Sequence, residues 1–440
     1  MPGPRCAGGP KPMRGVMSLK LLLAGWRGGD APLSPTSENA RTWLGQVERW
    51  FQANASEWLE SSRFGTGPRG APQLRLRLHP AAGEVSFLAA SGSRVVISAE
   101  TSAVGPGYHV FLCDTLKAMG QALDIQWVQA DDTLDVGDPT GYFHTGDAGP
   151  VEVYMLAWLQ ETVAQVLRMR SLGESGFSMS LRFGHMFEHP GALLTPLGPR
   201  DERWMRRVYE DPRVGMDVFP WWRQGVGAHA RLGRALCRLW TEVVWRPPLL
   251  EEERRLLRDV ARSLELAWRE DPELAYPWRE WREVLGYLGV GGTLAETVHH
   301  HADHHGARGP SIGYRRGAVQ VALPAGWEIR IPGSLAEAHL EDGTWVARDH
   351  RRSVRFVPLE DDAEEHFATT TAERRALELE YQGERVSGRA SLHMEPGECR
   401  LTALCSSGRH RALCVVSFAD PEEEDWALGT WRSLDHAAAA

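Results

Sequence analysis

A glycine-rich junction between an expected strand and an expected helix is the feature that most constrains how this chain folds. Residues 94–99 are rich in β-branched side chains and predict a strand, and residues 110–119 predict a helix that stops at Gly120. Gly105-Pro106-Gly107 lies between them and predicts a tight turn. A strand, a sharp turn and a helix in this order favour an α/β arrangement in which the helix packs back over a sheet.

Such a junction can present free backbone N–H groups and the positive end of a helix to an anion. We therefore predict an anion or ligand site formed by Gly105, Gly107 and Tyr108. His109 follows directly, and a histidine near a helix N-terminus is biased towards the neutral form that serves as a general base. The alternative is that Tyr108 and His109 pack against neighbouring residues and only fix the turn.

An acidic loop at 131–150 supplies further candidate side chains. It contains Asp138 and His144, which together with His109 form our predicted catalytic set. Its aspartates could also hold a hard cation through oxygen ligands, although the loop lacks the spacing of a twelve-residue calcium loop. The alternative is a solvated turn rich in aspartate.

The length of 440 residues exceeds that of one ordinary core, so several domains are expected. Residues 1–16 are rich in proline and glycine and predict a disordered leader, which leaves Met1 and Met17 as alternative starts. Residues 17–305 predict a mixed α/β domain that includes a helical subdomain at about 150–305. Within it, the glycine and proline of 63–72 predict a loop.

Residues 306–313 are rich in glycine, proline and serine and predict a linker. After this linker the pattern changes to short β-type runs, so 314–436 predict a β-rich α/β domain with a terminal helix at 425–434. The expected fold class is therefore α+β. The chain has 18 tryptophans, of which we expect Trp327 and Trp431 to lie in the C-terminal core.

Charge and cysteine content bear on the expected partners. The net charge of −9 argues against a nucleic-acid-binding protein, which needs a concentrated basic surface. No apolar run is long enough to span a bilayer, and the six cysteines form no C-x-x-C pair. These features predict a cytoplasmic protein with reduced thiols, with no nucleic acid or membrane among its partners.

A histidine tract near residue 300 is a candidate metal site. His300 and His304, and likewise His301 and His305, have the i, i+4 spacing that places two imidazoles on one face of a helix. No organic cofactor is expected, and a divalent metal held by these four histidines is the candidate cofactor. The alternative is an exposed helix that carries histidines at its C-terminal end.

The C-terminal part, about 313–434, resembles the Mog1/PsbP-like fold. The residues that carry this resemblance are the opening Leu323-Pro324-Ala325-Gly326-Trp327, the strands that follow, and the closing segment from Phe418 to Leu434. The resemblance implies a binding or assembly module, because known members of that fold are mostly of this kind. It transfers no functional residue to this chain.

Catalytic signatures are missing from the sequence: it contains no G-x-S-x-G, no P-loop and no G-x-G-x-x-G after a strand. We therefore expect a non-enzymatic, cytoplasmic protein of bacterial type that interacts with or assembles another protein. The alternative is a hydrolase or transferase with its site at the 105–109 junction and the 131–144 loop.

Overall fold

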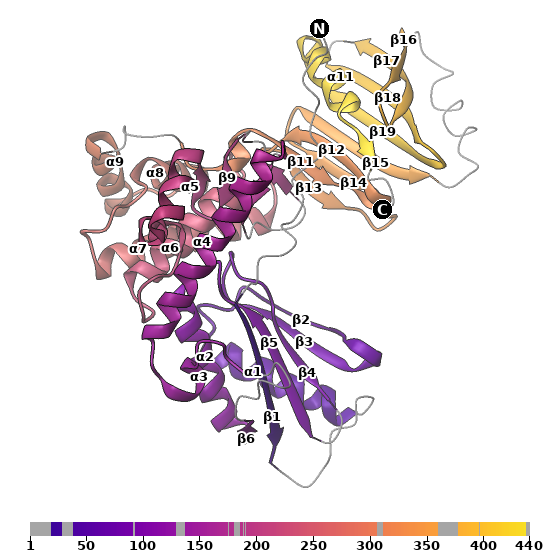
Figure 1. The fold of residues 1–440 in the computed structure, drawn as a ribbon. Helices are drawn as coiled ribbons and strands as arrows, with labels where there is room; N and C mark the ends of the chain where they lie inside the picture. The colour runs from indigo at the N-terminus through magenta and orange to yellow at the C-terminus, as the bar shows by residue number, and fades with distance from the viewer. Residues whose placement is uncertain are drawn as a thin grey trace.

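The computed structural model describes most of the chain, in the ranges 19–28, 38–90, 93–128, 137–174, 176–179, 185–187, 189, 191–305, 311–359, 377–395 and 397–436. The expected leader 1–16 and residues 306–310 of the expected linker lie outside these ranges. The fold is a mixed α+β, multidomain fold, as expected, and its buried side chains gather into three hydrophobic clusters. Figure 1 shows an N-terminal sheet with its helices, a helical part, and a β-rich C-terminal part arranged as an arch.

The N-terminal part is built on a six-stranded antiparallel sheet. In spatial order its strands are β2 (Ser61–Thr66), β3 (Pro72–Arg77), β4 (Val85–Ala89), β5 (Arg94–Glu100), β1 (Lys20–Arg27) and β6 (Ile125–Trp127). The loop predicted for 63–72 is wrong in its first part, because 63–66 belong to β2. This strand lies at the sheet edge and is mostly exposed, so it lacks the alternating apolar pattern that marks a strand in a sequence.

Helices cover this sheet and continue into the rest of the chain. They are α1 (Glu38–Asn54), which contacts β3 and β4, α2 (Pro106–Ala122), which contacts β6, α3 (Tyr142–Thr145) and α4 (Gly149–Ser171). In α1, Trp43, Val47 and Phe51 recur every four residues and are all buried. The helix α2 begins at Pro106, four residues before its expected start, because proline is well suited to the first helical position. The expected turn is therefore confined to Gly105, and the helix continues through Gly120 to Ala122.

Short strands and then a set of helices form the middle of the chain. The strands are β7 (Phe177–Ser178), β8 (His185–Phe187), β9 (Leu193–Thr195) and β10 (Gly198–Arg200), and η2 (Pro212–Val218) is a 3-10 helix. The helices are α5 (Glu202–Glu210), α6 (Ala228–Thr241), α7 (Glu251–Glu270), α8 (Trp278–Leu288) and α9 (Thr293–His305). The pairs α6–α7 and α8–α9 pack against each other and bury a core of their own. In the described ranges, no helix combines the length and apolar character that crossing a membrane requires.

Two antiparallel sheets form the C-terminal part. One contains β20 (Asp435–His436), β12 (Trp327–Pro332), β11 (Ala318–Ala322) and β8, in that order. The other contains β13 (Ala336–His339), β14 (Trp345–Arg348), β15 (Arg352–Leu359), β19 (His410–Phe418), β18 (Glu398–Ser407), β17 (Ser387–Glu395) and β16 (Leu377–Gln382). The closing helix α11 (Glu424–Arg432) packs on β18 and β19, and Trp327 and Trp431 are buried, as predicted.

The strand β8 connects the C-terminal part to a segment that the sequence places in the N-terminal domain. It pairs with β11, and Phe187 and Leu194 lie in the C-terminal hydrophobic cluster. The hydroxyl of Tyr314 also donates to the carbonyl oxygen of Thr195 at 2.8 Å. The C-terminal core therefore includes side chains from both sides of the expected linker.

Candidate functional site

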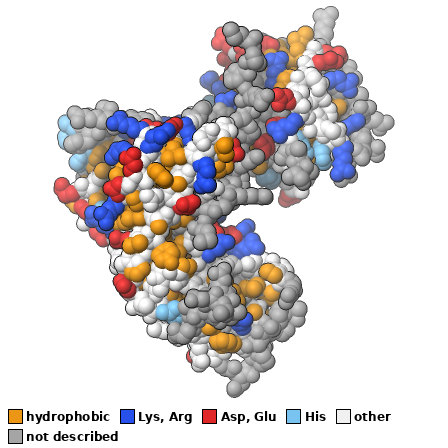
Figure 2. All heavy atoms as spheres, viewed as in Figure 1, with side chains coloured by type: hydrophobic (Ala, Val, Ile, Leu, Met, Phe, Trp, Pro, Cys, Tyr) orange, Lys and Arg blue, Asp and Glu red, His pale blue; other side chains and the backbone are white. Residues whose placement is uncertain are grey.

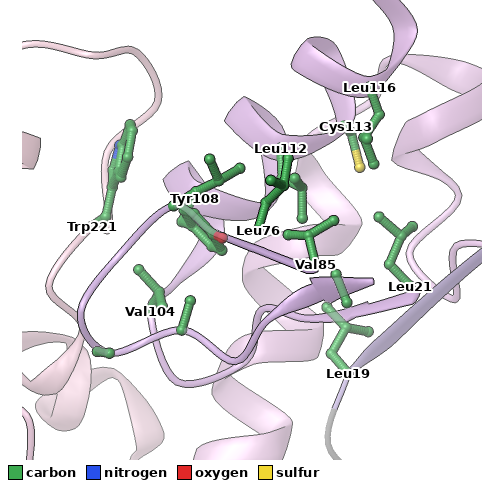
Figure 3. Close-up of a cluster of buried hydrophobic side chains, with 14 of the residues drawn as sticks. Leu19, Leu21, Leu76, Val85, Val104, Tyr108, Leu112, Cys113, Leu116 and Trp221 are labelled. Carbon is green, nitrogen blue, oxygen red and sulfur yellow. The ribbon is translucent and has the colours of Figure 1, made fainter. Parts of the chain in front are cut away.

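The predicted anion site at the start of α2 lies beneath the segment 219–223. Gly105 adopts a φ of 118°, a conformation that favours glycine. The amide of Gly107 donates to the carbonyl oxygen of Trp221 at 3.1 Å, and Gly105, Gly107 and Tyr108 are all buried. The structure therefore places a backbone carbonyl group where we expected an anion. Figure 3 shows Tyr108 on the inner side of α2 and Trp221 on the covering segment.

His109 belongs to a buried polar cluster, which we call the His109 cluster and define as Thr101, His109, Cys113, Asp138 and Thr140. The side chains of His109 and Asp138 are 0% exposed, and Nε2 of His109 lies 3.2 Å from Oδ2 of Asp138. The same nitrogen lies 3.6 Å from Sγ of Cys113 and 3.3 Å from Oγ1 of Thr140. The other ring nitrogen, Nδ1, lies 2.9 Å from Oγ1 of Thr101. Three polar atoms thus approach one nitrogen in a site closed to solvent.

Asp138 reaches this cluster because the chain before it is fixed to the sheet. Gly137 forms a β-bridge with Leu22 of β1. The Asp138 carboxylate then accepts hydrogen bonds from the amides of Thr140 and Phe143, each at 2.9 Å. Burial by itself raises the pKa of Asp138, but the hydrogen bond and charge of His109 and the two amides outweigh it and lower this pKa to about 2. Asp138 is therefore held as a carboxylate.

The structure brings together only two of the three predicted catalytic residues, His109 and Asp138. The ring of His144 is exposed and lies edge-on to Phe143, and no hydrogen bond joins it to His109 or Asp138 in the part of the chain that the structure describes. The aspartates at 131, 132 and 135 of the predicted acidic loop lie outside the described residues.

The geometry of the His109 cluster does not match a nucleophilic relay. In such a relay the base uses one ring nitrogen for the nucleophile and the other for the orienting carboxylate. Here Cys113 and Asp138 both face Nε2. Burial and the neighbouring Asp138 also raise the pKa of Cys113 well above its usual range, which favours the unreactive thiol. We found no support here for the hydrolase or transferase alternative.

Sequence analysis missed Cys113, Thr101 and Thr140 as neighbours of His109. Cys113 follows His109 by four residues, so the helical i, i+4 spacing was a usable signal for this pair. Asp114, the acidic residue next to it, instead accepts a hydrogen bond from the hydroxyl of Tyr142 at 3.0 Å. Neither threonine carries a sequence signal, because both reach the ring through tertiary packing.

The histidine tract on α9 is only partly gathered in space. The rings of His300 and His304 have centroids 4.2 Å apart, and both residues are exposed. His301 instead stacks on Trp278, with ring centroids 4.2 Å apart. The side chain of His305 lies outside the described residues. Of the four predicted metal ligands, the described side chains that lie together at the surface are therefore His300 and His304.

A charged cavity lies where the three parts of the molecule meet. Its volume is about 640 Å³, within the range of about 300–1,000 Å³ typical of ligand sites. Its carboxylates are Glu60, Glu242, Glu252, Glu253, Asp259 and Glu337. Its cationic side chains are Arg238, Arg255 and Arg315, and His185 adds an imidazole. We call it the junction cavity.

Two ion-pair networks form the inner wall of the junction cavity. Glu60 accepts hydrogen bonds from Arg234 and Arg238 of α6. Burial raises the pKa of Glu60, but the two guanidinium groups outweigh it and lower this pKa below its usual range. On the opposite side, Glu337 lies 2.9 Å from Arg315 and 2.7 Å from His185.

Comparison with known proteins gives no relative for this chain: no family model matches it, and no curated protein is similar to it.

Proposed function

We propose that this chain is a non-enzymatic cytoplasmic interaction protein that binds a basic peptide segment of another protein in the junction cavity. The observation that carries the proposal is the excess of carboxylates in the cavity wall, six against three guanidinium groups and one imidazole. A cleft of this size lined mainly by one sign of charge favours a ligand of the opposite sign. The five cysteines in the described ranges are all free, which supports a reducing compartment.

The carboxylates of the cavity differ in how far protein cations neutralise them. Glu60 is paired with two arginines, and Glu253 lies 2.7 Å from Arg246. Asp259 lies at the exposed edge, where its carboxylate approaches Arg238 at 3.6 Å, which is beyond hydrogen-bond length. Glu252 is exposed beside it on α7. The edge formed by Glu252 and Asp259 is therefore where a lysine or arginine side chain of the partner would bind.

Arg238 lies among the carboxylates of the cavity. Its Nη2 donates to Glu60, whereas Nε lies 4.0 Å from Glu242 and Nη1 lies 3.6 Å from Asp259, both beyond hydrogen-bond length. This one guanidinium group therefore neutralises the surrounding carboxylates only in part. The C-terminal part adds a separate line of support, because it resembles the Mog1/PsbP-like fold, whose known members are mostly binding and assembly modules.

A protein segment fits the proposal better than a nucleic acid does. On the face shown in Figure 2, blue and red side chains are mixed over the helical part, without a broad basic area. Recognition of nucleic acid would need such an area to neutralise phosphates.

The test is binding of a fluorescein-labelled peptide in which lysine and arginine alternate with glycine, measured by fluorescence anisotropy. We expect binding that weakens with added salt, because it depends on charge. The double variant Glu252→Gln/Asp259→Asn should bind about tenfold more weakly, since it removes two carboxylates from the cavity edge.

The matched control is Glu251→Gln/Glu265→Gln, which removes two charges from the same helix, at positions that do not line the cavity. This control should bind like the wild type. Equal weakening of peptide binding in both double variants would show that only the overall charge matters and would refute the proposal. A glutamate–glycine peptide that binds as well as the basic peptide would also refute it.

A further inference from the structure

Several polar atoms crowd one nitrogen of His109 in a buried site. Nε2 of an imidazole carries either one hydrogen or one lone pair, so it makes one good hydrogen bond. Asp138 and Cys113 both place an atom within 3.6 Å of it, while the nearby hydroxyl of Thr140 donates to the Asp138 carboxylate. A metal ion is a single centre that can bind the nitrogen, the sulfur and the carboxylate at once.

We propose that the His109 cluster is a structural site for a divalent transition metal of the zinc class, with Nε2 of His109, Sγ of Cys113 and Oδ2 of Asp138 as ligands. The three candidate ligand atoms lie within 4.8 Å of one another, and all three residues are buried. Imidazole, thiolate and carboxylate are the groups that bind zinc in proteins. The hydroxyl of Thr140 donates to Oδ1 of Asp138 at 2.8 Å and so helps to orient this carboxylate.

The separations between these atoms agree with tetrahedral coordination. Zinc bond lengths of about 2.0–2.1 Å to nitrogen, 2.3 Å to sulfur and 2.0–2.2 Å to oxygen give about 3.6 Å between nitrogen and sulfur, and about 3.3 Å between nitrogen and oxygen. The structure has 3.6 Å from Nε2 to Sγ of Cys113 and 3.2 Å from Nε2 to Oδ2 of Asp138. Both separations from Nε2 therefore agree with shared coordination of one ion, and the third, between Sγ and the carboxylate, is at most 4.8 Å.

Charge and orientation also fit a metal. Binding would release the thiol proton of Cys113 to solvent, and the resulting thiolate and the Asp138 carboxylate would together balance a divalent cation. The buried site would then carry no net charge, which avoids the large cost of an uncompensated charge. Oγ1 of Thr101 lies 2.9 Å from Nδ1 of His109. With Nε2 bound to a metal, Nδ1 would carry the hydrogen and donate it to Thr101. A hydrogen bond of this kind commonly orients a histidine that binds a metal.

The role of the ion follows from what the site connects. His109 and Cys113 lie on α2, whereas Asp138 lies in the loop that bridges to β1 through Gly137. The site is closed to solvent, so a metal there would tie this loop to α2 and would not meet a substrate. This inference is independent of the function proposed for the junction cavity.

The test begins with untagged wild-type protein expressed in medium supplemented with zinc, and separately with cobalt. After dialysis against a weak chelator, we expect about one equivalent of zinc per chain, because the metal is incorporated as the chain folds. The cobalt-loaded protein should show the intense near-ultraviolet charge-transfer band of a cobalt–thiolate bond. The proposal would be overturned if folded wild-type protein retained less than about a tenth of an equivalent of zinc and the cobalt preparation showed no such band.

Variants assign the site. Cys113→Ser should abolish the thiolate band, whereas Cys237→Ser, which removes a buried thiol from α6, should leave it unchanged. His300→Gln/His304→Gln should also retain the band, and loss of metal only in this variant would assign the metal to α9 instead. Should Cys113→Ser fail to fold, the wild-type cobalt spectrum still decides whether a thiolate binds the metal.

Thr101→Val tests the orienting role of Thr101 without removing a ligand. Loss of an outer-shell partner typically weakens metal binding about 10- to 100-fold, and we expect a loss of this size in competition with a chromophoric chelator. Thr101→Ser, which keeps the hydroxyl, should bind metal like the wild type. Unchanged affinity in Thr101→Val would contradict the assignment of Nδ1 to this role.

Discussion

Glu60→Gln should lower the free energy of unfolding by about 3–5 kcal/mol, measured by chemical denaturation. Glu60 accepts hydrogen bonds from Arg234 and Arg238, whose side chains are 9% and 6% exposed. The amide would leave both guanidinium groups buried without their main counter-charge, and removal of one partner from a buried ion pair is strongly destabilising. The loss of stability should be large because these two ion pairs join the N-terminal part to α6.

The matched control is Glu57→Gln. Glu57 pairs with Arg231, which lies on α6 like Arg234 and Arg238, but the Glu57 carboxylate is 44% exposed. Exposed pairs contribute about 0–1 kcal/mol, so this variant should unfold almost like the wild type. Equal effects in the two variants would show that the buried position of Glu60 does not matter.

The same carboxylate predicts a dependence on pH. The pKa of Glu60 is lowered in the folded protein from its ordinary value of 4.5. A group of this kind contributes stability above its unfolded pKa, and that contribution is lost as the pH falls through the folded value. The difference in stability between wild type and Glu60→Gln should therefore shrink as the pH falls below about 4.5. A difference that stays constant between pH 7 and pH 3 would contradict this assignment.

Trp431→Ala should also destabilise the protein strongly, by about 3–5 kcal/mol in the transition of the C-terminal part. Trp431 is 1% exposed, and its indole N–H donates to Sγ of Cys405 at 3.3 Å. Alanine would leave a cavity between α11 and β18 and remove this hydrogen bond. Thermal and denaturant unfolding followed by circular dichroism would measure the change.

Trp426→Ala is the matched control on the same helix. Trp426 is only partly buried and lies against Arg352, with the guanidinium carbon 5.1 Å from the ring centroid. Its removal should cost less than that of Trp431, because a partly buried side chain leaves a smaller cavity that water can enter. A larger loss for Trp426→Ala would show that the helix is stabilised through its outer face.

Much of the local structure could be predicted from the sequence because its signals are local. The β-branched residues of 94–99 identified β5, and the pattern of 110–119 identified most of α2. The edge strand β2 carried no comparable pattern because nearly all of its side chains are exposed, whereas the residues of β16 do alternate between apolar and polar and were not singled out. Periodicity reports burial on one face, so it fails where that burial is missing.

The sequence by itself determined that α2 carries His109 and Cys113 on one face, since four residues make about one helical turn. Only the tertiary structure decided what that face meets. It brought Asp138 to His109 across 29 residues, Glu60 to Arg238 across 178 residues, and β8 into the C-terminal sheet. The physical reason is that helix spacing is set by neighbouring residues, whereas these pairings depend on which distant surfaces bury one another and satisfy one another's charges.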